Sequence, residues 1–167
     1  KIVAAHDWDS WKQRTKYDGA IPPSLKDFLK LKIDEKFTPL SEIEIIDWFD
    51  KHPETILVTD KLDNALLIKD RLKKIQGNLI IELFTEKSIE EALSNNFSKI
   101  LISQRIIFKN KFSENYLNYL LNQNNVPYGF AVSQQSIYNN PEFFKKAKSL
   151  GFKTYAYNIN EKFDKYV

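Results

Sequence analysis

The sequence contains no cysteine and no methionine, and only two of its 167 residues are histidine. The absence of cysteine excludes disulfides, thiolate nucleophiles and cysteine-ligated zinc together. No apolar run approaches the roughly 20 residues that are needed to cross a membrane, so we expect no transmembrane segment. Because the chain begins Lys-Ile-Val and has no methionine anywhere, we expect that it does not start where translation starts.

The charges are nearly balanced, with 25 basic and 22 acidic residues spread along the whole chain. This even distribution argues against a dedicated nucleic-acid surface, while a sequence pI near 8.9 is compatible with an anionic ligand. A hydrophobic content of 43% over 167 residues is ordinary for one globular domain with a real core. The composition therefore predicts a single soluble domain.

Strand and helix patterns alternate along the chain. The helix that begins after Ser41 has a capping box, because Glu44 stands three residues later. The predicted helices are residues 24–31, 41–52, 63–75, 87–95, 113–121 and 141–150, and the predicted strands are residues 2–5, 55–59, 79–84, 99–103, 128–132 and 152–157. Strands that are joined by single crossover helices run parallel, so the pattern predicts an α/β fold with six parallel strands.

Six parallel strands are compatible with an open doubly wound sheet or with part of a closed barrel. No glycine-rich phosphate loop follows any of the strands, and the repeating units are even in size, which favours the barrel. An eight-stranded barrel typically needs about 250 residues. We therefore predict an incomplete TIM-type (β/α)8 barrel over residues 1–167, truncated at both ends, with about six of the eight strands present and the first and last missing.

The dipeptide His6-Asp7 stands at the end of the apolar run 2–5, before the polar stretch 8–15. Histidine titrates near neutral pH, and catalytic groups of parallel α/β enzymes collect at the carboxyl ends of strands. This position makes His6 a candidate catalytic residue. A surface histidine, or one that only supports another residue, is the alternative for this dipeptide.

Four segments in order resemble motifs of the glycerophosphodiester phosphodiesterases, a family of phosphatidylinositol-phospholipase-C-like phosphodiesterase barrels. Residues 3–8 (VAAHDW), with Arg14-Thr15 downstream, resemble the second histidine motif, where an apolar strand ends in His-Asp and an Arg-Thr follows. Residues 38–40 (TPL) resemble the segment before the next helix of that family. Residues 55–61 resemble the strand that ends in an acidic metal ligand and a lysine, and residues 155–160 (YAYNIN) resemble the late strand that closes in Trp-Thr-Val-Asn.

The resemblance implies metal-dependent hydrolysis of a glycerophosphodiester, or of a related phosphorylated lipid or polyol headgroup, by a histidine pair with Ca²⁺ or Mg²⁺ as the cofactor. It gives His6 the role of the acid that protonates the leaving alcohol. It also makes Asp60 a metal ligand and places Lys61 and Tyr157 in the substrate pocket. Glu82 is a second candidate metal ligand, because a carboxylate inside an otherwise apolar strand needs a partner or a metal.

The sequence also departs from the family pattern. In the family the acidic ligand and the lysine are two residues apart and point the same way, whereas Asp60 and Lys61 are adjacent, so a regular strand would point them to opposite faces. Three of the candidates also have a purely structural interpretation. This is a helix cap or turn residue for Asp60, an outward-facing residue under a helix end for Glu82, and a core residue for Tyr157. The family's first histidine and a Glu-x-Asp pair precede its His-Asp motif, so we expect them upstream of Lys1 in the parent protein.

Two other functions remain open at this point. One is a barrel of the same family that binds a phosphorylated ligand or a glycan without catalysis, which the displaced lysine makes reasonable. The other is an open α/β binding domain that is unrelated to this family. Release of glycerol 3-phosphate that depends on a divalent cation would distinguish the hydrolytic function from these two binding functions.

Overall fold

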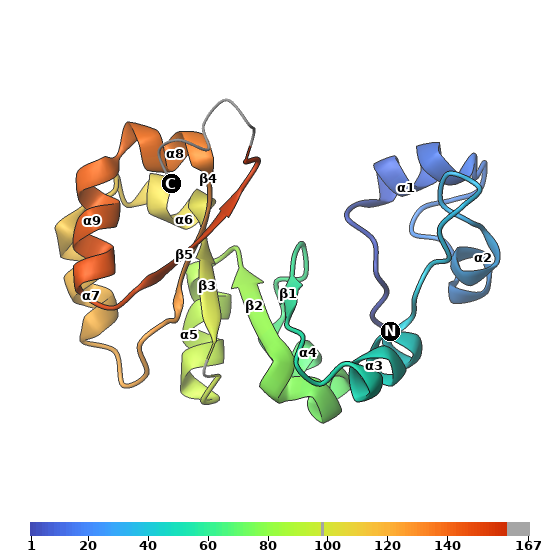
Figure 1. Ribbon diagram of the computed structural model, residues 1–167, viewed down its shortest axis with the longest axis horizontal. Coiled ribbons are helices and arrows are strands. Elements are labelled where there is room, and N and C mark those ends of the chain that lie inside the picture. Colours follow the sequence, from blue (N-terminus) through green and yellow to red (C-terminus); the bar gives the residue numbers. More distant parts are fainter. Residues whose placement is uncertain (98, 160–167) are drawn as a thin grey trace. The chain divides into compact units, whose positions relative to one another are not determined.

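The computed structural model describes residues 1–97 and 99–159 (Figure 1). These residues form two compact units. The first contains residues 1–57 and 67–79, and the second contains residues 58–66 and the described residues from 80 onward. Each unit has a core of its own and is described separately.

The first unit is mainly helical. Its elements are α1 (Trp8–Thr15), α2 (Leu25–Lys30), α3 (Glu42–Lys51), most of α4 (Ala65–Arg71) and the 3₁₀ helix η1 (Lys73–Asn78) (Figure 1). The capping box predicted from Ser41 and Glu44 is present at the start of α3. Among the described residues of the whole chain, no helix is long and apolar enough to span a bilayer.

An aromatic cluster forms the core around α1. Trp11 is buried and stacks on Phe28 at 5.4 Å between ring centroids, while Trp8 meets both rings edge to face. Trp8 and Trp11 lie three residues apart and therefore share one side of the helix. The two tryptophans thus anchor α1, an element that the sequence analysis treated only as a polar stretch after His6.

A parallel sheet forms the centre of the second unit. Its strands, in spatial order, are β1 (Leu57–Thr59), β2 (Leu79–Leu83), β3 (Ile100–Ser103), β4 (Gly129–Ser133) and β5 (Lys153–Tyr157). The connecting helices are α5 (Glu86–Ser94), α6 (Gln104–Lys109), α7 (Glu114–Leu121), α8 (Gln134–Asn139) and α9 (Pro141–Ser149) (Figure 1). Because each strand lies next to its predecessor, right-handed crossovers bring all the helices to the same face of the sheet.

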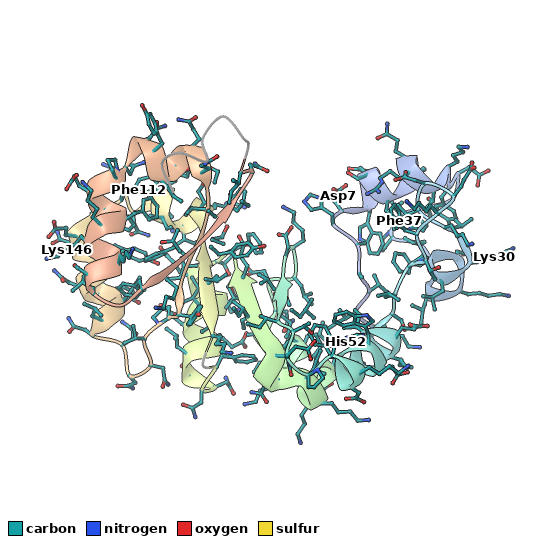
Figure 2. All side chains as sticks on the ribbon, in the orientation of Figure 1. Asp7, Lys30, Phe37, His52, Phe112 and Lys146 are labelled. Carbon is teal, nitrogen blue, oxygen red and sulfur yellow. The ribbon has the colours of Figure 1, made fainter. Side chains whose placement is uncertain are left out.

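The two faces of the sheet carry different side chains. On the helix-covered face, Phe130 is fully buried and packs against Phe143 of α9 and against Phe152. Phe112 adds to this aromatic core through contacts with α9, and Figure 2 labels it beside that helix. The opposite face carries a smaller apolar cluster built on Ile80, Leu101 and Ala131, with Val58 and Tyr128 packed against it.

The prediction of an incomplete six-stranded TIM-type barrel is wrong, because the described residues contain a sheet of five strands. The α/β character and the parallel strand pairs are confirmed. The missing strand is the run 2–5: Val3 makes only an isolated antiparallel bridge with Ser41, and Ala4 donates to the Leu40 carbonyl at 2.9 Å. None of these four residues is buried, so the run lacks the burial that holds a central parallel strand in a sheet.

Candidate functional site

The register of the sheet in the second unit places Glu82, Ser103 and Tyr157 on one face. Side chains two residues apart on a strand point to the same face, and residues in register across parallel strands do so as well. The pairs that fix the arrangement are Glu82 with Leu101, Ser103 with Ala131, and Ser133 with Tyr157. The three side chains therefore stand on the face opposite the helices, progressively nearer the carboxyl ends of the strands.

Glu82 is the buried carboxylate of this face, with 8% of its surface exposed. Burial raises its pKa, and the nearby charge of Asp60 raises it further, while a hydrogen bond with Ser103 and the charge of Lys61 act in the opposite direction. The Glu82 backbone N–H donates to the Thr59 hydroxyl at 3.3 Å, which ties β2 to the end of β1. The Glu82 carboxylate thus lies within electrostatic range of one other carboxylate, Asp60, and of the Lys61 ammonium group.

Asp60 and Lys61 directly follow β1. Lys61 has a φ of 60°, in the left-handed region, so the chain leaves the regular strand geometry at this residue. Its Nζ atom lies 3.6 Å from Asp60 Oδ1 and 6.0 Å from the centre of the Phe84 ring. The expectation that adjacent residues point to opposite faces does not apply here, because it assumed a regular strand.

Tyr157 ends β5. Burial raises the pKa of its hydroxyl, and the charges of Glu82 and Asp60 raise it further. The tyrosine and the two carboxylates are therefore within electrostatic range of one another. A phenol of raised pKa keeps its proton at neutral pH and remains a hydrogen-bond donor.

His6 belongs to the first unit. It does not follow a strand of the sheet, and its imidazole is largely exposed, with Nδ1 at 2.6 Å from Asp7 Oδ2. Asp7 is the N-cap of α1, as Figure 2 shows at the start of that helix, and it accepts the Ser10 N–H at 2.7 Å. Hydrogen bonds from the Ser10 backbone and from His6 lower the pKa of Asp7 to about 2. The carboxylate therefore orients the imidazole.

Ser103 is the residue of this site that the sequence analysis missed. It has a counterpart in Ser133, since β3 and β4 both end in a serine, a glutamine begins the helix that follows, and both serines are N-caps with similar backbone angles. The Ser133 hydroxyl caps α8 by accepting the Ser136 N–H at 3.3 Å. The Ser103 hydroxyl makes no such bond to α6 and interacts with Glu82 instead. Comparing the Ser-Gln pairs at residues 103–104 and 133–134 would have indicated Ser103 from the sequence.

We expect Ser103→Ala and Ser133→Ala to have different effects. Ser133→Ala removes a helix cap and should lower the free energy of unfolding by about 1 kcal/mol. Ser103→Ala removes a bond that favours the charged form of Glu82 and should raise the pKa of that carboxyl group. Denaturant unfolding and an NMR titration of the Glu82 carboxyl carbon measure the two effects. An equal rise of the Glu82 pKa in both variants would contradict the assignment.

Glu82→Gln should stabilise the protein at neutral and higher pH. The folded-state pKa of Glu82 lies above its ordinary value of 4.5, so the carboxyl group binds its proton more tightly in the folded protein than in the unfolded chain. Its burial penalty is absent below pH 4.5 and grows as the pH rises through the folded-state pKa. Unfolding free energies of both proteins at pH 4 and pH 8, without divalent cations, test this. An advantage of the variant that does not grow with pH would contradict it.

The carboxylates of Asp60, after β1, and Glu82, in β2, are the candidate ligands for a divalent cation, which would keep part of its water shell. Within residues 1–97 and 99–159, no three His, Cys, Asp or Glu side chains form a metal-ligating cluster. Asp60 and Glu82 supply two carboxylates, and the charge of Asp60 contributes to the raised pKa of Glu82. Mg²⁺ in proteins is commonly bound by one or two carboxylates together with waters and substrate phosphate oxygens. A cation held by these two carboxylates would take its other ligands from water and phosphate oxygens.

A comparison with protein-family models, a search of curated proteins and a search of solved structures each returned no match. The family resemblance of the sequence therefore stays a prediction. The functional proposal therefore depends on the residues at the carboxyl ends of the strands and on the electrostatic interactions between them.

Proposed function

We propose that the protein binds a glycerophosphodiester, or a related phosphorylated lipid or polyol headgroup, together with a divalent cation, and hydrolyses it. The observation that carries this proposal is the electrostatic coupling of two carboxylates, one lysine and one tyrosine at the carboxyl ends of β1, β2 and β5. In parallel α/β folds, ligands bind outside the carboxyl ends of the strands. The combination of carboxylates with an ammonium and a phenol group suits a cation and a phosphate together.

Each residue has a distinct role in this proposal. Asp60 and Glu82 would hold the Ca²⁺ or Mg²⁺ ion, which neutralises charge on the nonbridging phosphate oxygens. The Lys61 ammonium group and the protonated Tyr157 hydroxyl donate hydrogen bonds to the phosphodiester. The role of the acid that protonates the leaving alcohol is given to His6 by the family resemblance alone.

A binding function without catalysis is the second candidate. It is favoured by the position of the two histidines in the sequence, since both lie within residues 1–57, whereas the carboxylates, Lys61 and Tyr157 belong to the second unit. The second unit taken alone has charged and hydrogen-bonding groups for a phosphorylated ligand or a glycan, and no side chain that titrates near pH 7 by its ordinary pKa.

An assay of glycerol 3-phosphate release from a glycerophosphodiester separates the two functions. The full-length parent protein, in which the first histidine is expected, should release product with Mg²⁺ or Ca²⁺ and should lose this activity in a chelator. His6→Ala should lower the rate at least about a hundredfold, as expected for the loss of a general acid. His52→Ala is the matched control and should retain activity.

Two results would change the assignment. A rate that survives His6→Ala unchanged would remove His6 from the role of acid. Saturable, cation-dependent binding of the phosphodiester without any product would replace the hydrolytic function by the binding one.

A further inference from the structure

A hollow on the helical side of the second unit shares no lining residue with the site formed by Asp60, Lys61, Glu82, Ser103 and Tyr157. It lies along α5 and the segment that leads into α7, both visible in Figure 1, and has a volume of about 370 Å³. Its lining is polar and aromatic and includes Glu86, Glu90, Asn110, Ser113, Tyr116 and Tyr119. We refer to it as the α5–α7 cavity.

Two tyrosines form one wall of the α5–α7 cavity. The rings of Tyr116 and Tyr119 stack with centroids 6.0 Å apart and an interplanar angle of 18°. Tyr119 is 47% exposed, so its ring is accessible, whereas Tyr116 is only 7% exposed. Tyr116 is thus a largely buried residue of the cavity lining, and within the described part of the chain its hydrogen bond to Ser113 uses the backbone N–H and not the hydroxyl. A phenol hydroxyl in the lining is a group with which a ligand can form a hydrogen bond.

Three of the remaining lining residues, Glu86, Glu90 and Asn110, offer hydrogen-bond acceptors. Glu86 and Glu90 are four residues apart on α5 and therefore on the same side of the helix. Glu86 accepts a hydrogen bond from Lys109 Nζ at 3.1 Å, while Glu90 has no ion pair among residues 1–97 and 99–159. The Asn110 amide nitrogen donates to the Ile106 carbonyl at 3.0 Å, which leaves its side-chain oxygen as an acceptor. The cavity thus offers acceptors and one available negative charge.

We propose that the α5–α7 cavity binds a guanidinium group, with the carboxylate of Glu90 as its partner and the ring of Tyr119 as its stacking surface. A guanidinium group is planar, stacks on aromatic faces and presents several N–H donors in a fixed fork. The fork suits a carboxylate, with further N–H groups directed at the Tyr116 hydroxyl and the Asn110 oxygen. An ammonium group lacks the plane that stacks on tyrosine and concentrates its donors at one point.

Titration of the full chain with methylguanidinium chloride at low ionic strength tests this proposal. Two-dimensional NMR should show saturable shifts at the cavity residues with a Kd of about 1 mM. Glu90→Gln should weaken binding about tenfold through the loss of a charge-assisted contact. Tyr119→Ala should weaken it about threefold through the loss of the stacking surface. Both residues are exposed, so the variants should fold.

Glu142→Gln and Tyr138→Ala are matched controls, because both residues are exposed and lie outside the cavity. L-lysine should bind more weakly than L-arginine. Equal affinities for L-arginine and for the peptide acetyl-Gly-Arg-Gly-amide would assign the site to a free small molecule, and tighter binding of the peptide would assign it to an arginine of a polypeptide. The proposal is overturned if methylguanidinium shifts no cavity resonance, or if the cavity variants bind as well as the controls.

Discussion

Asp60→Asn should lower the rate of glycerophosphodiester hydrolysis about a thousandfold. The substitution keeps the size of the side chain but removes one of two negative charges that would hold the cation. A bound divalent ion stabilises the charge of the phosphoryl transition state by several kcal/mol, and each 1.4 kcal/mol corresponds to a factor of ten in rate. Initial rates of glycerol 3-phosphate release over a series of Mg²⁺ concentrations measure the effect, and raised Mg²⁺ should recover part of it.

Asp70→Asn is the matched control for this substitution. Asp70 lies on α4, and its side chain is 78% exposed. The control should retain the wild-type rate and the wild-type unfolding midpoint. If Asp60→Asn retained full activity at low Mg²⁺, Asp60 would not be a ligand of a catalytic cation.

Gly129→Ala should lower the free energy of unfolding by about 3 kcal/mol or more. A Cβ atom at Gly129 would lie 1.9 Å from the Lys153 carbonyl oxygen and 2.6 Å from its carbonyl carbon. Both are backbone atoms of β5 in register with Gly129, so no side-chain rotation can relieve the clash. Overpacking usually costs about 1–3 kcal/mol, and a clash with a paired strand belongs at the upper end of this range.

Gly77→Ala provides the comparison, because no atom lies within 4 Å of the position of its added Cβ. It should change the free energy of unfolding by less than about 1 kcal/mol. Urea unfolding followed by circular dichroism measures both variants. A Gly129→Ala protein as stable as Gly77→Ala would contradict the close approach of β4 and β5.

The sheet was largely predictable from sequence because its strands are buried. Residues 79–83 of β2 are all buried, and the apolar run that predicted this strand reflects that burial. The run 2–5 has a similar composition, but its partner is the segment before α3, and no local pattern specifies such a pairing. The helix α1 was missed for a related reason: residues 8–15 were treated only as a polar stretch after a predicted strand, although Asp7 is an N-cap and Trp8 and Trp11 lie three residues apart.

The site was predictable only in part. Glu82 is visible in sequence as a charge inside an apolar strand, and the structure places it near Asp60, Lys61 and Tyr157. The interaction of Ser103 with Glu82 depends on the register between β2 and β3, which the sequence of either strand alone does not specify. The left-handed turn at Lys61 also escapes sequence analysis, because a lysine carries no signal for that backbone conformation.

Thermal unfolding with and without Mg²⁺ tests most directly whether Asp60 and Glu82 together hold a divalent cation. A ligand at a hundred times its Kd stabilises the folded state by about 2.7 kcal/mol, which corresponds to a rise of about 5 °C or more in Tm. We predict this rise for the wild-type protein and its loss in both Asp60→Asn and Glu82→Gln. No rise in the wild-type protein, or the same rise in the two variants, would contradict the account.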